Sequence, residues 1–382
     1  MQSQNLNNLL NSKDFFGYIS EHYTKDLPFV VYSLPNTFET KAVLQKDSAL
    51  YKIEDYNETG FVFAPFDIRK DAILMPYSKS RMLLTLEDIV VDEEESIPFD
   101  IDNDEPHHLH LVEKGIESIK KGGLQKVVLS RKETLDLESP LDPLKVFKTL
   151  LNSYNSAFVY CWYHPNVGLW LGATPETLLS IERNRFSTMA LAGTQDYEGT
   201  LEVNWNTKEI EEQKLVSDYV EKALQEHIKD IEVSEVQTVK AGRLLHLRTD
   251  ISGTLMDHSK SIQKLILKLH PTPAVCGLPK IDAMQFILDN EHYNREFYSG
   301  FLGELNKETK VQPRSGLRNI ENTAYAFNKR STNLFVNLRC MQIRNSKAIL
   351  YVGGGITKDS NPKNEWLETV NKTNTIKNVI VS

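Results

Sequence analysis

The stretch YVGGGITKDSNPKNEWLETVNK, residues 351–372, organises the chain. An apolar strand end runs into three consecutive glycines, Gly353, Gly354 and Gly355, and glycine lets a ligand approach the backbone closely. The Ser-Asn-Pro sequence at 360–362 then predicts the start of a helix, because a capping side chain precedes a proline in the first turn. We therefore expect a strand, a glycine-rich turn and a final helix.

Two carboxylates lie one turn into this final helix. Glu365 and Glu368 stand at i and i+3, and Lys372 follows four residues after Glu368, so the three share one helical face. Either the carboxylates hold a hard cation beside the glycines, or Glu368 and Lys372 form an ordinary ion pair on a solvated face. A second carboxylate pair upstream favours the cation.

Residues 207–228 are predicted to form a long amphipathic helix that begins TKEIEEQKLV. Glu209 and Glu212 share a face near its start, and spacing alone does not decide between Glu212 and Glu211. Two helices that each offer a carboxylate pair make an oxygen-only site. Such a site suits Mg²⁺ and argues against zinc.

Size and composition indicate an ordinary soluble globular protein. The chain has 382 residues, with 40% hydrophobic and 25% charged side chains. Its net charge of −8 argues against nucleic acid or an anionic membrane as a partner, so an anionic substrate would need a local positive site or a metal. Three separated cysteines, no signal-peptide pattern and no membrane-length apolar run predict a cytoplasmic protein with free thiols.

The chain divides by pattern into two parts. Residues 1–105 hold short strand-like runs and end in an acidic stretch, 91–105, that we interpret as a solvated loop. In residues 106–382, runs of strands alternate with helices, and no glycine- or proline-rich linker interrupts them. This pattern predicts an α+β fold with largely antiparallel sheets.

Three charged residues stand out among apolar neighbours. Lys126 begins the strand-like run KVVLSR, where it either reaches the surface or is buried near a functional site. Glu176 lies at a turn between two apolar strands, and a turn carboxylate is the ordinary interpretation. Arg339 is the one charge in the apolar run NLFVNLRCMQI (333–343) of the strand predicted at 332–344, so it requires an anion from the protein or a ligand.

Together these pieces resemble the chorismate-utilising enzymes, which include isochorismate, salicylate, anthranilate and aminodeoxychorismate synthases. The resemblance covers most of residues 106–382 in the expected order, whereas the first hundred residues match no known pattern. The matching pieces are KVVLSR (126–131), GATPETLL (172–179), LAGT (191–194), KEIEEQKLV (208–216), HLRTDISG (246–253), HPTPAVCGLPK (270–280), FYSGFLG (297–303), NLRC (337–340) and GGGITKDSNPKNEWLETVNK (353–372).

The resemblance implies a single large domain of two stacked, mainly antiparallel sheets flanked by helices, with Mg²⁺ and chorismate in a cleft. Residues 1–105 would be a variable part of this domain, and 106–382 its chorismate-binding catalytic region. Position by position, the resemblance implies Glu212 and Glu365 as the principal metal ligands, with Glu209 and Glu368 as their partners. It thereby chooses Glu212 over Glu211.

The resemblance also implies a set of substrate contacts. His246 would lie near the substrate ring, and Tyr298 and Arg339 would grip the enolpyruvyl carboxylate. Further contacts are implied for Gly193, Thr194, Gly353, Gly354, Gly355 and, near the ring carboxylate, Lys372. One departure is Gln213, where the family usually has histidine; glutamine can still donate a hydrogen bond.

Within the family, the residues favour an isochorismate synthase. Lys126 indicates water as the nucleophile, since anthranilate synthases typically lack this lysine, and the LAGT at 191–194 differs from the PIKGT of aminodeoxychorismate synthases. Salicylate synthases typically carry threonine where this chain has Ala274. Salicylate synthase remains the alternative, followed by anthranilate synthase component I and a chorismate-binding protein without turnover. A magnesium-dependent phosphohydrolase would more often show aspartate- or histidine-containing metal motifs.

The implied reaction is a reversible isomerisation. Neutral Lys126 takes a proton from the water that attacks C2, and protonated Glu176 delivers a proton to the departing C4 hydroxyl. We expect a monomer that needs no amidotransferase subunit, and a product that serves menaquinone or catecholate siderophore synthesis.

Overall fold

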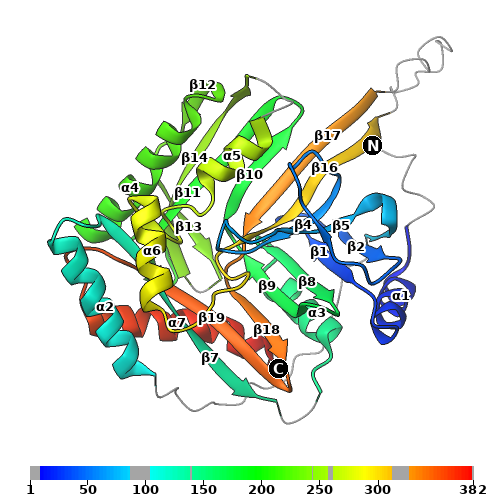
Figure 1. The fold of residues 1–382 in the computed structure, drawn as a ribbon, viewed down its shortest axis with the longest axis horizontal. Helices are drawn as coiled ribbons and strands as arrows, with labels where there is room; N and C mark the ends of the chain where they lie inside the picture. Colours follow the sequence, from blue (N-terminus) through cyan, green and yellow to red (C-terminus); the bar gives the residue numbers. More distant parts are fainter. Residues whose placement is uncertain are drawn as a thin grey trace.

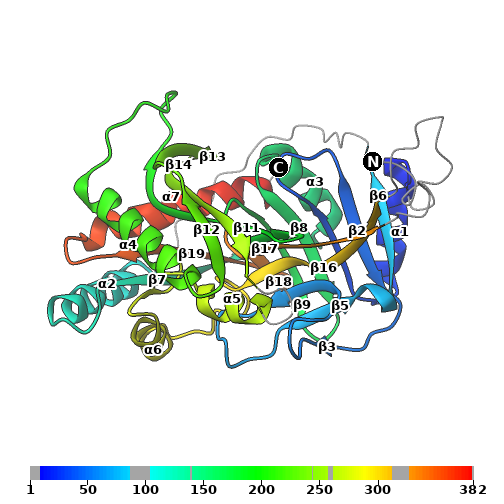
Figure 2. The ribbon, with the colours of Figure 1, turned by 90° about the horizontal axis from the view of Figure 1, so that it is seen from above.

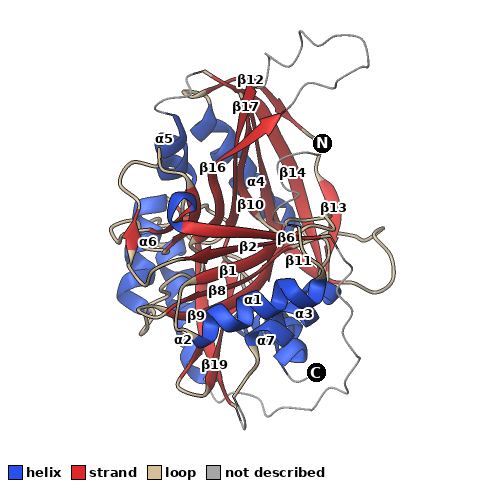
Figure 3. Ribbon diagram, turned by 90° about the vertical axis from the view of Figure 1, so that its right-hand side faces the viewer, coloured by secondary structure: helices blue, strands red, loops and turns tan. Residues whose placement is uncertain are grey.

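A computed structural model of the chain describes residues 9–86, 104–137, 140–242, 244–256, 261–311 and 327–380. Two large antiparallel sheets stack against each other, with helices on their outer faces (Figures 1 and 3). This confirms the expected α+β class and the pair of stacked sheets. Most of the expected acidic loop at 91–105, and the first part of a strand expected at 324–328, lie outside the described residues.

In the described chain, the first sheet has nine strands, and each neighbouring pair is antiparallel. Their order is β15 (Gly277–Leu278), β7 (Lys126–Asp136), β19 (Lys347–Ile356), β18 (Cys340–Arg344), β9 (Gly168–Thr174), β8 (Phe158–His164), β1 (Phe29–Ser33), β2 (Thr40–Gln45) and β6 (Ser80–Thr85).

The second sheet is likewise antiparallel. Its order is β12 (Ile228–Val233), β14 (Leu244–Leu255), β11 (Arg185–Asp196), β10 (Thr177–Glu182), β17 (Phe327–Val336), β16 (Phe301–Val311), β4 (Gly60–Ala64), β5 (Ile73–Pro76) and β3 (Tyr51–Lys52), and β13 (Gln237–Ala241) pairs with β14. Strands from the first hundred residues therefore enter both sheets.

The sheets join through an aromatic layer. Phe63 of β4 lies 4.8 Å from Trp162 of β8, and Phe158 of β8 stacks on Phe335 of β17 at 4.2 Å between ring centroids. These rings are buried, and large aromatic side chains contribute most to such an interface. The layer fixes the two sheets relative to each other and so fixes the residues that both sheets contribute to one cavity.

Helices cover the outer faces of both sheets (Figure 2). The helix α4 packs on β11 and β14 of the second sheet, while α2 and α7 pack on β7 and β19 of the first. The helices are α1 (Ser12–Thr24), the 3₁₀ turn η2 (Tyr77–Lys79), α2 (Glu105–Lys120), α3 (Pro143–Ser153), α4 (Thr207–Leu224), α5 (Ser261–Leu269), α6 (Lys280–Asn290) and α7 (Pro362–Ile380).

Several predicted boundaries were wrong. The helix expected at 207–228 ends at Leu224, because the chain turns and enters β12 at Ile228. The single strand expected at 332–344 is divided into β17 and β18 by residues 337–339. The strand expected at 297–304 begins at Phe301. Among the helices described, none is both long and apolar enough to cross a membrane.

Candidate active site

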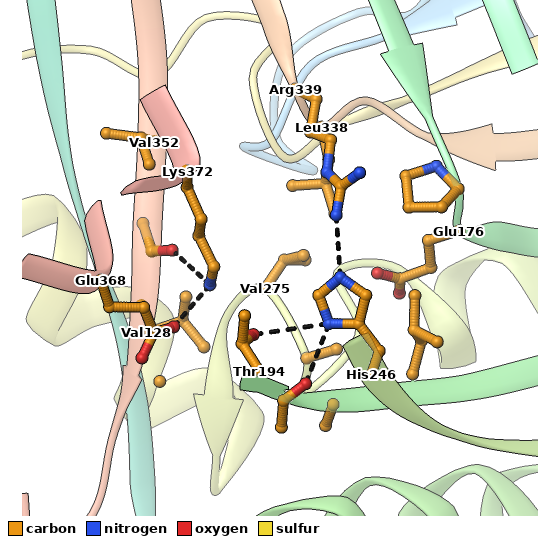
Figure 4. A pocket seen from close by; sticks show the side chains of 18 of the residues that line it. Val128, Glu176, Thr194, His246, Val275, Leu338, Arg339, Val352, Glu368 and Lys372 are labelled. Atoms are coloured by element: carbon orange, nitrogen blue, oxygen red, sulfur yellow. Dashed lines mark hydrogen bonds and ion pairs between the residues drawn. The ribbon is translucent and has the colours of Figure 1, made fainter. Parts of the chain in front are cut away.

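A cavity of about 110 Å³ is lined by β7 and β19 of the first sheet, by β11 and β14 of the second, and by α4 and α7 (Figure 4). The structure brings most of the predicted site residues to its wall. Those that line it are Glu176, Gly193, Thr194, Glu212, His246, Ala274, Tyr298, Arg339, Gly353, Gly354, Gly355, Glu368 and Lys372. Segments that are far apart in the sequence therefore converge on one site.

The glycines of β19 admit carboxylates from two helices. A Cβ at Gly354 would lie 3.5 Å from Glu365 Oε2 and 3.7 Å from Glu368 Oε1, both on α7. A Cβ at Gly355 would overlap the Glu212 carboxylate of α4. Because successive residues of a strand point to opposite faces, α7 reaches the strand from one side and α4 from the other.

The side chain of Lys126 is buried and does not reach the protein surface. Its side chain is 0% exposed at the start of β7, and its Nζ lies 2.9 Å from Glu212 Oε1. Burial alone would raise the pKa of Glu212, but Lys126, Lys208 and Lys372 together lower it, and the net shift is downward. The contact between Lys126 and Glu212 is a buried ion pair.

The two carboxylates of α7 also have lysine partners. Lys208 Nζ, from α4, lies 2.5 Å from Glu365 Oε1. Lys372 Nζ lies 2.6 Å from Glu368 Oε1 (Figure 4) and 3.2 Å from the carbonyl oxygen of Gly353. The Glu368–Lys372 ion pair therefore exists, but on the cavity wall rather than on a solvated face. Burial and the proximity of Glu368 raise the pKa of Glu365.

The carboxylates fit a hard divalent cation by their chemistry. Every candidate ligand atom of the carboxylates is an oxygen. Two of these atoms, Glu209 Oε2 and Glu365 Oε2, are buried without a hydrogen-bond partner. Among the described residues, no three His, Cys, Asp or Glu side chains stand close enough together to hold a metal, and the ammonium groups of lysines lie among the carboxylates. A cation at this site would have to replace these ammonium groups.

Glu176 lies at the junction of β9 and β10, as the sequence indicated, and is 3% exposed. Burial raises its pKa to about 8, although Lys126 and a hydrogen bond from Thr272 act in the opposite direction. The Thr272 hydroxyl donates to Glu176 Oε1 at 3.4 Å, and the Glu176 carbonyl accepts from Val336 N–H at 3.0 Å. Glu176 is therefore a fixed carboxylic acid that is largely protonated at neutral pH.

Arg339 lies in the break between β17 and β18, not within a strand, and its φ of 46° is unusual for a residue with a side chain. Its Nη1 donates to the Ala241 carbonyl at 3.0 Å, and its Nη2 lies 2.8 Å from His246 Nε2 (Figure 4). Burial lowers the pKa of Arg339 to about 10. No carboxylate within the described ranges pairs with this guanidinium, so it can receive an anionic ligand.

Other predicted contacts complete the wall. Tyr298 lies in the turn before β16 rather than in a strand, and its ring stacks on Tyr351 at 5.5 Å. Ala274 lines the cavity beside Val275. The unusual Gln213 is buried and donates to Thr249 Oγ1 at 2.6 Å, so its amide is satisfied by the neighbouring strand β14.

Sequence reasoning missed Lys208 and Thr272. Both stand inside the matching pieces KEIEEQKLV and HPTPAVCGLPK, which was the available signal, but their partners come from distant segments. The apolar part of the wall was also missed. It is made by Val128, Leu191, Ala192, Val275, Leu338, Val352 and Ile376.

The chain is similar to known proteins at the level of family, sequence and solved structure. A family model described as chorismate binding enzyme matches residues 87–328, and a second model with the same description matches residues 323–378. The isochorismate synthase DhbC of Bacillus subtilis is 28% identical over 281 residues, 69% of this chain and 65% of that protein. The isochorismate synthase EntC of Escherichia coli is 28% identical over 265 residues, 67% of this chain and 62% of that protein.

The matched region thus spans a little under two thirds of these curated relatives. Among solved structures, MenF of Escherichia coli, the menaquinone-specific isochorismate synthase, aligns with a TM-score of 0.71 at 20% identity, covering 92% of this chain and 88% of that one. At this identity the likeness concerns the fold. Since a family model covers more than half of its residues, the chain belongs to the chorismate-binding enzyme family.

Proposed function

We propose that this protein isomerises chorismate to isochorismate. The observation that carries the proposal is the pairing, around one cavity, of a buried lysine with a buried carboxylic acid. Lys126 is fully buried beside the cavity, and Glu176 on its wall has a pKa of about 8. A buried carboxylic acid with a raised pKa, beside a buried lysine, is typical of acid–base catalysis.

The proposed chemistry exchanges one hydroxyl position for another. Water attacks C2 of the ring and gives a proton to neutral Lys126, while Glu176 gives its proton to the C4 hydroxyl, which leaves as water. The ring double bonds shift between the two carbons. One water enters and one leaves, so the product has the formula of the substrate, and proton exchange with solvent restores Lys126 and Glu176. The same groups can act in the reverse direction.

For the two carboxylates of chorismate, the cavity offers one positive region at Arg339 and a second region, at the carboxylate cluster, that a bound cation would make positive. Arg339 supplies a guanidinium without a carboxylate partner in the described chain, held by Ala241 and His246. Tyr298 lines the same cavity and can add a hydroxyl donor. Lys372 and the carboxylate cluster lie beside the glycines of β19. We infer that Arg339 binds the enolpyruvyl carboxylate and that the ring carboxylate faces the cluster.

We infer that Glu212 and Glu365, supported by Glu209 and Glu368, would hold Mg²⁺. When bound, the ion would neutralise the ring carboxylate and withdraw electron density from the ring. Engagement of Glu212 would also release Lys126 from its ion pair, which is the condition for a neutral base.

The expected product depends on the side chain of Ala274, which lines the cavity. An alanine offers no hydroxyl to the ring, and we infer that isochorismate leaves without loss of pyruvate. The test is incubation of the purified protein with chorismate and Mg²⁺, with products separated by chromatography. We expect an equilibrium mixture of chorismate and isochorismate, reached from either side.

Two other outcomes would contradict the proposal. Pyruvate formed in stoichiometric amount with salicylate would identify a salicylate synthase. Product that forms only when ammonia is added would place the protein in the aminating branch. The variants Lys126→Gln and Glu176→Gln should each lose on the order of a hundredfold or more in kcat. Near-normal kcat in either variant would remove that residue from the mechanism.

A further inference from the structure

Arg131 occupies the opposite face of the strand that carries Lys126. Both residues belong to β7 and are five positions apart, so their side chains point to different sides of the sheet. Lys126 turns toward α4 and the cavity, whereas Arg131 turns toward α7. The Arg131 side chain is buried, with 3% of the residue exposed. A buried arginine needs a full set of partners, and those partners show what it holds.

Three of its partners lie on α7. The guanidinium lies over the Trp366 ring at 4.4 Å, Nε donates to Thr369 Oγ1 at 2.8 Å, and Nη2 donates to Thr373 Oγ1 at 3.4 Å. Thr369 and Thr373 are themselves buried. One planar group therefore contacts two successive turns of the helix.

Each of these partners directly follows a residue of the candidate site. Trp366, Thr369 and Thr373 come one position after Glu365, Glu368 and Lys372, respectively. In an α-helix, one position is a rotation of about 100°, so the two sets form adjacent stripes along α7. Rotation or translation of α7 that loosened the contacts to Arg131 would move both carboxylates and Lys372 relative to the glycines of β19.

The rest of the surroundings keep Arg131 in place. Its Nη1 donates to Glu133 Oε2 at 3.1 Å, and Glu133 also forms an ion pair with Lys377 near the end of α7. Behind Trp366, the ring of His108 from α2 lies 5.8 Å away. Glu133 is thus shared between Arg131 and Lys377, and these contacts hold the planar group of Arg131 in one orientation.

We propose that Arg131 is a positioning residue that sets the rotation of α7 and so presents Glu365, Glu368 and Lys372 to the cation and substrate. The proposal rests on the proposed function, because it gives these three residues the roles assigned there. Arg131 touches neither substrate nor cation. It acts through the helix, in the way that outer contacts orient metal ligands in other proteins.

The test compares Mg²⁺ affinity with folding stability. Isothermal titration calorimetry with Mg²⁺ and urea denaturation are applied to the full-length protein and to Arg131→Gln, Arg131→Lys and Thr369→Val. We expect Arg131→Gln to weaken Mg²⁺ binding about 10- to 100-fold, the usual effect of losing such an outer contact. Arg131→Lys should not rescue binding, because an ammonium lacks the planar fork that stacks on Trp366 and reaches two threonines. Thr369→Val removes one acceptor at nearly constant shape and should weaken binding less.

Val379→Ala is the matched control. Val379 is buried on the same helix, in the apolar cluster at its far end, so its truncation destabilises α7 without touching the Arg131 contacts. We expect lower stability and unchanged Mg²⁺ affinity for this variant. Arg131→Gln and Thr369→Val with wild-type Mg²⁺ affinity would overturn the proposal and leave Arg131 a packing residue.

Different results would refute the proposed function. Wild-type protein that binds Mg²⁺ but leaves chorismate unchanged would refute the isomerase, while the effect of Arg131 on Mg²⁺ affinity would still stand. Wild-type protein that binds no Mg²⁺, even with chorismate present, would refute the cation site and the positioning role together.

Discussion

The Nε2 atom of His246 lies 2.8 Å from Nη2 of Arg339, and this contact fixes the state of the imidazole. A guanidinium can only donate, so Nε2 must be the acceptor. Nδ1 lies 2.9 Å from the Gly193 carbonyl oxygen, which can only accept, so Nδ1 carries the hydrogen. Burial and Arg339 lower the pKa of His246 to about 3, and the ring is neutral throughout the physiological range.

Replacing His246 with leucine should therefore weaken chorismate binding. The variant removes the acceptor that orients Arg339, and a hydrogen bond to a charged group contributes about 1.5–3 kcal/mol. We expect KM for chorismate to rise on the order of tenfold or more in steady-state kinetics. Because the neutral ring does not titrate above pH 5, the wild-type pH profile should show no step from His246. An unchanged KM would separate His246 from substrate binding.

Ionisation of Glu176 should cause the fall in kcat/KM on the alkaline side of the pH profile. In the proposed mechanism its acid form is the proton donor, and with a pKa of about 8 that form is present at neutral pH and lost as the pH rises through 8. We expect kcat/KM to fall about tenfold per pH unit above this value. Glu176→Gln should remove this fall along with most of the activity. A wild-type profile that is flat to pH 10 would contradict the assignment.

The substitution Glu365→Gln should abolish activity and leave folding intact. The carboxylate is buried, and burial together with Glu368 raises its pKa, so the folded state gains nothing from its ionisation beyond the contact to Lys208. We expect turnover to be abolished while the melting temperature stays close to that of the wild type. The matched control is Glu211→Gln on α4, an exposed carboxylate that should leave both unchanged. Normal turnover of the Glu365 variant at limiting Mg²⁺, after EDTA treatment, would refute the metal site.

The buried pair of Arg295 and Glu291 should dominate stability near β7. Arg295 Nη2 lies 2.6 Å from Glu291 Oε1 and also donates to the Val128 carbonyl at 2.7 Å, while Glu291 accepts from the Ser130 amide at 2.7 Å. Glu291→Ala leaves a buried, unpaired guanidinium and should cost about 3–5 kcal/mol of unfolding free energy in urea denaturation.

The exposed pair Lys25–Glu21 provides the comparison, since it has the same i, i+4 spacing and a 2.6 Å contact. Glu21→Ala should produce no measurable loss, because solvent screens an exposed ion pair. Equal losses in the Glu21 and Glu291 variants would show that burial is not the deciding factor.

Local pattern was sufficient for much of the fold. Alternation and helical periodicity predicted α4, α7 and β7 with errors of a few residues, and the i, i+3 spacing placed Glu365 and Glu368 on one face. The boundaries that failed are set by tertiary contacts. Residues 297–300 make a turn because Ser299 N–H donates to the Asn337 carbonyl, a bond to a segment far along the chain.

The site was predictable only in part, for the same reason. Pattern alone left Lys126 either at the surface or buried near a functional site, and its burial beside Glu212 depends on a distant helix. Likewise Glu211 and Glu212 have equivalent spacings, but only Glu212 is buried against the glycines. The family resemblance supplied these choices because it carries information about three-dimensional neighbours that one sequence does not.

The glycines of β19 have a consequence for how the protein tolerates mutation. Gly355 contributes no functional group, yet any side chain there would collide with Glu212 and with the Lys126 stem 3.1 Å away. In a saturation-mutagenesis map scored by growth, Gly355 should be as intolerant as a ligand residue. Gly355 matters because its missing side chain leaves space for Glu212 and Lys126. Selection should preserve that space as strictly as it preserves a charged residue.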